Sequence, residues 1–363
     1  MVASLAILLI FGLIGCYLKN PMFGSLPKGQ ELDEIKKSPN YWGGQFQNIV
    51  PTTRLSKDSS VISLLKRRMK DKTQLKPQVE IPVIKNDLHN LSKEQDIVIW
   101  LGHSSYFIQV DGKRILVDPI LSSHASPFPF LIKAFNSTEK YSIDDIPAID
   151  YLLITHDHWD HLDYPTIIGL KSKVNHVVCG LGVGNYFKKW GFASKVIHEG
   201  DWFSEVEVAH NFTVHILPTR HFSGRMLQAN KTLWVGFALE INNKKIFLSG
   251  DGGYGPHFKS IGKMFGGFDL VVMENGQYDK NWPNIHIMPE EAAQAAVDLQ
   301  AKALLPGHSG KFALSNHAWD EPLKRISKAS EKYDYRLITP MIGEVVEINN
   351  NEQKFDFWWE NIG

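Results

Sequence analysis

The 363-residue sequence has little cysteine and no excess of charge of either sign. It contains two cysteines, Cys16 and Cys179, so a disulfide framework and a metal site made only of thiolates are both excluded. Lys and Arg together number 39, as do Asp and Glu, and the formal net charge is zero. Because a broad nucleic-acid footprint needs a basic face that releases counterions, we expect no nucleic-acid partner.

Apolar and aromatic side chains are plentiful, at 43% and 11% of the residues. Such a composition supports a sizeable core, and the length fits one large domain or two ordinary ones. Global disorder is excluded for the same reason. The 15 histidines are the unusual feature of the composition, and several of them fall in the motifs described below.

An uncharged and almost wholly apolar run covers residues 2–18, and Lys19 ends it. The run is slightly shorter than a membrane-spanning helix, which needs about 20 residues, but it suits the apolar part of a signal peptide. Within it, Leu13-Ile14-Gly15-Cys16 resembles a bacterial lipoprotein cleavage site, although no Lys or Arg precedes the run. We therefore expect residues 1–19 to be a signal, lipoprotein-type or membrane-anchor segment, with a buried helix as the alternative. The protein would then be membrane-associated, in the cell envelope if its source is bacterial.

Residues 20–90 are rich in Pro, Ser, Lys and Gln and are expected to form an irregular N-terminal extension that packs on the core. One short helix is predicted at residues 60–70, and it ends in a basic cluster at 66–70. The cluster fits a solvated face, and it also fits attraction to anionic lipid headgroups.

Short β-rich runs alternate with helical stretches in residues 91–363, which we take as the main domain. Strands are predicted at 96–101, 106–110, 114–117, 151–155, 174–179, 214–217, 233–241, 245–249, 270–273 and 303–305. Hairpin turns are predicted at Asp111-Gly112 and Asn242-Asn243, and helices after Asp163, which would cap the first of them, and from Pro289. One face of the second helix would carry Ala292, Ala296, Leu299 and Ala303. The pattern indicates an α/β protein in which two sheets pack together under surface helices.

A dense group of metal-ligand side chains follows the apolar strand at 151–155. It reads His156-Asp157-His158-Trp159-Asp160-His161. In an extended chain His156 and His158 point the same way, while Asp160 and His161 follow as the chain turns and can face a second metal ion. Imidazole and carboxylate are ligands that zinc takes, and so many of them in six positions would be unstable together without a cation. The segment therefore predicts a metal site.

The H-x-H-x-D-H segment resembles the signature of the metallo-β-lactamase superfamily. The resemblance implies a four-layer αββα sandwich, in which two mixed β-sheets are flanked by helices, and further ligands at later strand ends. His221, Asp251 and His308 follow predicted strands at the expected places. By this analogy one zinc ion takes His156, His158 and His221, a second takes Asp160, His161 and His308, and Asp251 bridges them. Two zinc ions held this way would share a water that ionises near neutral pH, although iron or manganese would fit the same ligands.

Two further segments, at 100–105 and 116–119, resemble superfamily loops that lie beside the metals. Asp118 is the expected carboxylate that orients a ligating imidazole. His103 has two readings, contact with the substrate or a hydrogen bond within its own loop.

Segments spread from Ser38 to near the C-terminus resemble the phospholipase D family that hydrolyses N-acylphosphatidylethanolamine. They include the metal-ligand segment and the runs at 263–269, 285–292 and 308–316. The resemblance implies a zinc-dependent phosphodiesterase in which a metal-bridging hydroxide attacks phosphorus and N-acylethanolamine and phosphatidic acid are released. It implies catalytic roles for Asp160, Asp251 and His286, with His286 hydrogen-bonded to phosphate or protonating the leaving group.

The run at 274–282 departs from that family around the substrate pocket, which leaves head-group selectivity open. A metallo-hydrolase of a soluble lactone, cyclic phosphate or sugar phosphate is therefore the alternative, and a non-catalytic binding protein is a third reading. The apolar loop at 126–135 fits either a lipid-facing lip or packing onto the domain. As partners we expect a phospholipid or other phosphodiester substrate and a membrane surface, and a homo-oligomer stays open.

Overall fold

The computed structural model describes residues 12, 15–57, 59, 73–225 and 228–362. Most of the apolar run at 2–18 and the whole of the helix expected at 60–70 lie outside the described residues. Within the described part of the chain, no helix is both long enough and apolar enough to cross a membrane.

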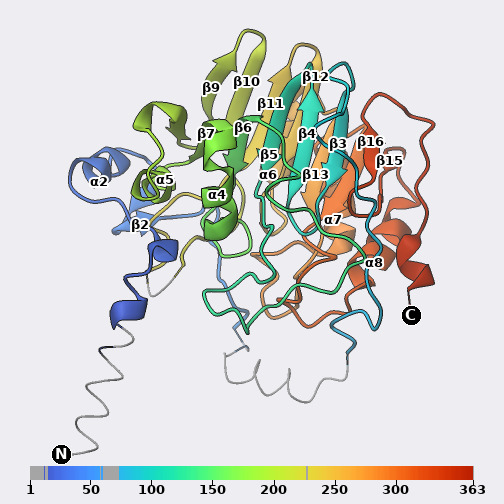
Figure 1. Ribbon diagram of the computed structural model, residues 1–363, viewed down its shortest axis with the longest axis horizontal. Helices are drawn as coiled ribbons and strands as arrows, with labels where there is room; N and C mark the ends of the chain where they lie inside the picture. The colour runs from blue at the N-terminus through green and yellow to red at the C-terminus, as the bar shows by residue number, and fades with distance from the viewer. Residues whose placement is uncertain (1–11, 13–14, 58, 60–72, 226–227, 363) are drawn as a thin grey trace, which may run out of the picture.

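Two β-sheets form the centre of the molecule, each with seven strands among the described residues (Figure 1). The first runs in the order β16 (Val345–Glu347), β3 (Ile97–Trp100), β4 (Tyr106–Val110), β5 (Lys113–Val117), β6 (Ile149–Ile154), β7 (Val174–Gly180) and β8 (Ile197–Gly200). The second runs in the order β15 (Arg336–Leu337), β14 (Ala303–Gly307), β13 (Leu270–Glu274), β12 (Lys244–Leu248), β11 (Gly236–Ile241), β10 (Phe212–Leu217) and β9 (Ser204–Ala209). Pairing is antiparallel from β16 to β5 and from β9 to β12, and parallel in the remainder of each sheet.

This mixed pairing sets the direction in which the strands leave each sheet. Two antiparallel steps restore the original direction, so β3, β5 and β6 run alike in the first sheet. In the second sheet β10, β12, β13 and β14 run alike for the same reason. The loops that follow these strands meet at one end of the sandwich, which is the lower end in Figure 1.

Apolar side chains that alternate along the strands fill the space between the sheets. On β10, Phe212, Val214 and Ile216 lie in the core, while Thr213 and His215 are only half-buried. The same core cluster contains Val98 and Leu153 of the first sheet. Each large apolar side chain buried in this way contributes about 1.5–3 kcal/mol to stability.

Helices cover the outer face of each sheet, which confirms the four-layer α/β sandwich (Figure 1). Helices α4 (Tyr164–Leu170) and α5 (Gly184–Lys189) contribute Ile167, Leu170 and Phe187 to a cluster with the outward side chains of β6. On the second sheet lie α6 (His257–Phe265), α7 (Pro289–Asp298) and α8 (Glu321–Ser330), which share a cluster with β13 and β14. Short 3-10 turns are η2 (Lys171–Lys173), η3 (Ser194–Val196) and η4 (Trp358–Asn361).

The N-terminal extension is more regular than the irregular segment we expected. It contains η1 (Pro21–Phe23), α2 (Gln30–Ile35), β1 (Tyr41–Trp42) and β2 (Gln45–Phe46). Phe46 is fully buried in the core between the sheets, and Ile35 joins it. Contacts with the main domain, rather than a local pattern, thus stabilise these short elements.

Two local predictions about the helices are wrong. Helix α7 ends at Asp298, so Ala303 lies on β14 and does not share a face with Ala292. Asp163 sits at the N-cap position of α4 but makes no capping bond, because its carboxylate accepts the Thr166 hydroxyl and the Ser122 hydroxyl instead. Strands β8, β9, β15 and β16 were not predicted. They are only partly buried, so their sequences contain no continuous apolar run that would indicate a strand.

Candidate metal centre

Seven predicted ligands come together at the end of the sandwich where the loops meet. We call them the ligand cluster: His156, His158, Asp160, His161, His221, Asp251 and His308. The first four follow β6, and the others follow β10, β12 and β14 respectively. Because these strands run toward the same end, residues separated by some 150 positions in the sequence become neighbours.

Three imidazoles form one part of the ligand cluster. His156 Nε2 lies 2.8 Å from His158 Nδ1, and His221 Nε2 lies 3.3 Å from the same atom. Ligands bound at about 2.0–2.1 Å to one tetrahedral zinc ion are separated by roughly 3.4 Å. The three nitrogens therefore form a group that can hold a metal ion.

Asp251 lies at the centre of the ligand cluster. Its Oδ2 is 3.2 Å from Nε2 of both His161 and His308, and 3.9 Å and 3.8 Å from Nε2 of His156 and His221. Asp160 Oδ2 lies 3.5 Å from His161 Nε2. One carboxylate is thus shared between the imidazoles of both parts of the cluster.

The residues present fit a metal centre, and unpartnered polar atoms are the direct sign of it. His161 Nε2, His308 Nε2 and Asp251 Oδ1 are buried and have no hydrogen-bond partner among the residues that the structure describes. A buried polar atom without a partner costs about 1–3 kcal/mol, and here three such atoms point into one space. Cations would satisfy them with the ligand types that zinc and related ions take.

Hydrogen bonds outside the cluster hold its rings in place. Asp118, directly after β5, accepts the Thr155 amide at 2.8 Å and lies 2.8 Å from His161 Nδ1. The Thr155 hydroxyl donates to Asp118 and lies 3.0 Å from His156 Nδ1. His221 Nδ1 lies 2.8 Å from the Ile285 carbonyl, which leaves Nε2 for the cluster.

His103 is fully buried, and its Nε2 lies 2.9 Å from Asp160 Oδ2. Its side chain thus contacts a carboxylate of the ligand cluster, outside its own loop, which is a contact that neither of the two readings anticipated. Its backbone carbonyl accepts the Trp100 indole N–H and the His308 amide, so the loop at 100–105 also supports His308.

Burial and neighbouring charges shift the pKa values of the side chains in the ligand cluster. Burial lowers the pKa of His156, His221 and His308 well below the usual range, so these imidazoles are neutral. Burial alone would raise the pKa of Asp251, but the neighbouring imidazoles, above all the charge of His161, lower it well below its usual range. The pKa of His161 is raised despite burial, because Asp251 and Asp160 favour its charged form. A cation would displace that proton, so metal affinity should fall as the pH is lowered.

The backbone is strained at three positions of the centre. His103, Asp118 and His308 have φ angles of 53°, 39° and 58°, in the left-handed region that favours glycine. Each such residue costs on the order of 1–2 kcal/mol. Surrounding hydrogen bonds offset this cost and keep the three side chains aimed at the cluster.

Glu274, the last residue of β13, is a site residue that the sequence reasoning missed. It is buried, its Oε2 accepts the Gly252 amide next to Asp251, and its Oε1 is hydrogen-bonded to His286 Nδ1. The charge of Glu274 raises the pKa of His286, although burial by itself would lower it. Its position at the end of a buried strand, like those of the ligands, is the signal that could have revealed it.

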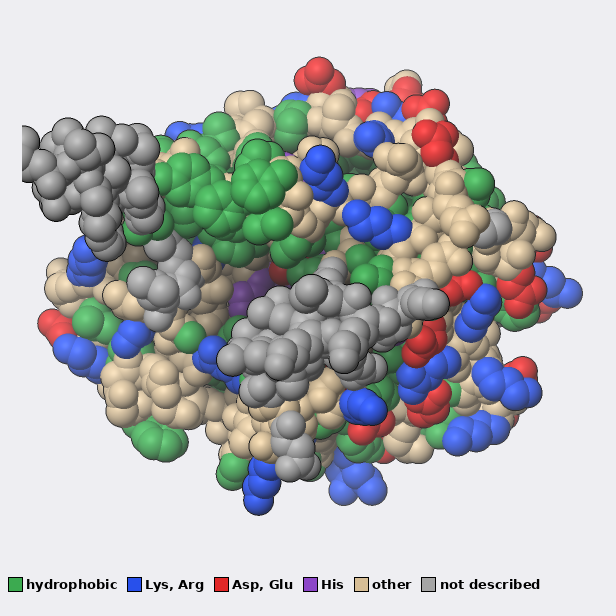
Figure 2. Space-filling view, turned by 90° about the horizontal axis from the view of Figure 1, so that it is seen from below, with side chains coloured by type: hydrophobic (Ala, Val, Ile, Leu, Met, Phe, Trp, Pro, Cys, Tyr) green, Lys and Arg blue, Asp and Glu red, His purple; other side chains and the backbone are tan. Residues whose placement is uncertain are grey.

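A cleft opens directly over the ligand cluster. Figure 2 shows histidine side chains at the floor of a hollow on this face, beside a group of hydrophobic side chains. The cleft encloses about 290 Å³. Its polar floor includes His158, Asp160, Asp251, His286 and His308, and its walls include Ala125, Ile132, Trp159, Phe222, Trp282, Ile285 and Leu314. The metal-ligand groups are therefore accessible, and the approach to them is mostly apolar.

Asp118 provides a test of the outer hydrogen bonds. We expect Asp118→Asn to weaken metal affinity by about 10–100-fold, because His161 loses the carboxylate that orients its ring. Competition with a chromophoric zinc chelator would measure the change. The exposed Asp144→Asn variant is the matched control and should bind metal like wild type. Equal affinities in all three proteins would contradict the role given to Asp118.

Fold and site together define a two-sheet α/β sandwich with a metal-ligand cluster at the loop end of its strands. Residues 113–309, just over half of the chain, match the family model described as a beta-lactamase superfamily domain. The chain therefore belongs to the metallo-β-lactamase superfamily and is a metal-dependent hydrolase of that superfamily, with its fold.

Known relatives match different shares of the chain. An uncharacterized protein of Mycobacterium tuberculosis is 33% identical over 329 residues, 89% of this chain and 88% of its own. The outer membrane protein RomA of Klebsiella pneumoniae is 57% identical over 113 residues, 31% of this chain and 86% of its own. An N-acyl-phosphatidylethanolamine-hydrolyzing phospholipase D of Caenorhabditis elegans is 29% identical over 269 residues, 69% of this chain and 75% of its own.

Solved structures show the same fold. A metallo hydrolase from the archaeon Ignicoccus hospitalis superposes with a TM-score of 0.52 at 18% identity. The match covers 69% of this chain and 97% of that one. At this identity the likeness concerns the fold alone.

Proposed function

We propose that this protein is a dinuclear zinc phosphodiesterase of the phospholipase D type, which cleaves N-acylphosphatidylethanolamine-like lipids. The observation that carries the proposal is the apolar cleft over the ligand cluster, walled by Trp159, Phe222 and Trp282. A lipid diester needs this combination, since its phosphate must reach the metals while its chains stay out of water. The similarity to the C. elegans phospholipase D supports the same substrate class.

Two zinc ions would share the ligand cluster. His156, His158 and His221 would hold one, Asp160, His161 and His308 the other, and Asp251 would bridge them. When bound, the ions would supply an ionised water as nucleophile and neutralise charge on the phosphoryl oxygens.

His286 is the group proposed to serve the leaving alkoxide. Its Nδ1 is engaged with Glu274, so Nε2 is the ring nitrogen left for the cleft that the residue lines. In the proposed reaction a bond forms between phosphorus and the water oxygen, and the bond from phosphorus to the N-acylethanolamine oxygen breaks. The alkoxide takes a proton from His286, which yields N-acylethanolamine and phosphatidic acid. Asp160, oriented by His103, would accept a hydrogen bond from the attacking oxygen.

Lipid mass spectrometry tests the proposal. Purified protein loaded with zinc should convert N-acylphosphatidylethanolamine into phosphatidic acid and N-acylethanolamine, and protein stripped with a chelator should not. A panel of acyl-lactones, a cyclic phosphate and a sugar phosphate should be poor substrates. Turnover of one of these without any lipid product would replace the lipid proposal by the soluble-substrate alternative. Failure of the pure protein to bind any transition metal would favour a binding protein.

We also propose that the rim of the cleft rests on a membrane surface. Residues 121–135 form a hairpin-like loop, which we call the 121–135 loop, because Ala125 and Ile132 pair through their backbones. The loop exposes Phe128, Phe130, Leu131 and Ile132, with Phe130 68% exposed. Tyr17, near the end of the N-terminal apolar run, stacks on Phe128 with ring centroids 5.4 Å apart. A membrane surface in contact with Tyr17 and Phe128 would therefore lie beside the cleft that takes the lipid.

Vesicle sedimentation measures this contact. We expect Phe130→Ser to lower binding to phosphatidylcholine vesicles by about tenfold, because inserting one phenylalanine contributes about 1.5–3 kcal/mol. Phe203→Ser removes a similarly exposed phenylalanine, 54% exposed and part of another pocket, and should have little effect. A membrane role for the loop would be wrong if both variants bound vesicles as wild type does.

A further inference from the structure

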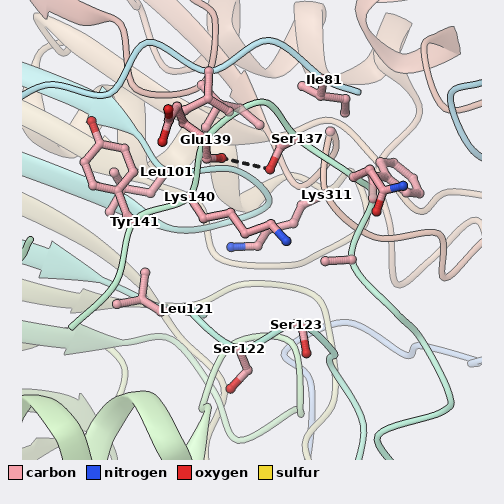
Figure 3. Close-up of a pocket in the computed structure, with 16 residues that line it drawn as sticks. Ile81, Leu101, Leu121, Ser122, Ser123, Ser137, Glu139, Lys140, Tyr141 and Lys311 are labelled. Atoms are coloured by element: carbon pink, nitrogen blue, oxygen red, sulfur yellow. Dashed lines mark hydrogen bonds between the residues drawn. The ribbon is translucent and has the colours of Figure 1, made fainter. Parts of the chain in front are cut away.

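A second pocket lies at the base of the 121–135 loop, separate from the catalytic cleft. The middle of the loop lines the cleft through Ala125 and Ile132, whereas its two ends line the second pocket through Ser123 and Phe135. The pocket encloses about 90 Å³, room for a small ligand group. Figure 3 shows Lys140 and Lys311 running toward each other in the middle of it.

Neither ammonium group forms an ion pair with another described residue. Lys311 Nζ donates to the Ile120 carbonyl, and no carboxylate of the described residues lies within 4.0 Å of it. Lys140 likewise forms no ion pair within the described part of the chain, although Glu139 also lines the pocket. Since an ammonium carries three donors, both lysines have donors to spare.

The electrostatics of the pocket agree with this geometry. The pKa of Lys311 is lowered to about 8. Burial is the main cause and the charge of Lys140 adds to it, whereas the charge of Asp163 acts in the opposite direction. Two cations that repel each other in a partly buried space are stabilised by an anion between them.

The other lining residues indicate which further groups a ligand of this pocket would carry. Ser123 and Asn136 lie among the lining residues, and no hydrogen bond of either side chain is found among the described residues. Ile81, Leu101 and Phe135 supply an apolar wall. An oxyanion with a short apolar neighbour therefore matches both the charge and the surface of the pocket.

We propose that Lys140 and Lys311 form a binding site for a phosphate group, either as free phosphate or as the headgroup of an anionic lipid. The site is distinct from the metal centre and goes beyond the proposed function. It is also joined to that centre, because Lys311 follows His308 by three residues and its carbonyl accepts the Phe135 amide. Occupancy would hold the base of the 121–135 loop against the segment that carries a metal ligand.

Calorimetric titration of the zinc-loaded protein with inorganic phosphate tests the site. Wild type should show a binding component that Lys140→Met and Lys311→Met each weaken by about tenfold or more, the loss of one charge-assisted contact. Lys133→Met removes an exposed lysine from the same loop outside the pocket and should leave this component unchanged. Phosphate bound at the metal centre would persist in all variants. Lys140 is exposed, so its variant should fold even if the Lys311 variant does not.

Vesicles distinguish the two sources of phosphate. If the ligand is a lipid headgroup, adding phosphatidic acid to phosphatidylcholine vesicles should increase wild-type binding, and Lys140→Met and Lys140→Ala should lose that increase while Lys140→Arg keeps it. If the ligand is free phosphate, only the calorimetric component should respond to these variants. Identical isotherms and identical vesicle binding for wild type, Lys140→Met and Lys133→Met would overturn the proposal.

Discussion

Replacement of Asp251 by Asn should lower kcat by about three orders of magnitude or more and reduce the metal content of the protein. Its Oδ2 lies within 3.9 Å of four imidazole nitrogens of the ligand cluster, so one substitution alters both parts of the cluster. An amide is neutral and cannot offset the charge of bound metal as a carboxylate does. Metal analysis of the purified variant, alongside lipid turnover, measures both effects.

Asp144→Asn is the matched control for Asp251→Asn, because it makes the same chemical change at an exposed position. It should keep wild-type activity and metal content. Circular dichroism should show that Asp251→Asn stays folded, since the amide has the same size and the strands around it are unchanged. A folded Asp251→Asn variant with full activity and a full metal complement would refute the bridging role.

Replacement of His286 by Gln should lower kcat on the lipid by about 10²–10³-fold without changing the metal content. The residue lies outside the seven ligands, and its Nδ1 is held by Glu274 while the ring faces the cleft. A p-nitrophenolate leaving group needs no proton, so the same variant should hydrolyse bis-p-nitrophenyl phosphate at a rate within about tenfold of wild type. The comparison of the two substrates separates proton donation from a general loss of structure.

The exposed His89→Gln variant serves as the control for His286→Gln and should match wild type on both substrates. An equal loss of activity on the two substrates would show that His286 acts on binding or folding. Unequal metal content between wild type and His286→Gln would show that the residue is a ligand instead.

The local sequence pattern was enough to predict much of the sandwich. The predicted strands at 106–110 and 270–273 coincide with β4 and nearly with β13, because both are buried runs with no competing pattern. Asp111-Gly112 forms the predicted hairpin turn, with φ angles of 50° and 69° that suit these two residue types. Edge strands such as β9 were missed because charged and apolar residues alternate along a half-exposed strand, which gives a weaker sequence signal than a buried apolar run.

The sequence alone determined the ligand types, their spacing after apolar strands, and hence a metal centre in a two-sheet α/β protein. Four of the seven ligands fall within six consecutive positions, and the others each follow a recognisable strand, so their chemistry is visible locally. Only the tertiary structure decided which distant side chains meet. It joined Glu274 to His286, placed His103 against Asp160 and brought Lys140 to face Lys311. Such pairs depend on sheet order and loop packing, which are long-range interactions that a local pattern does not encode.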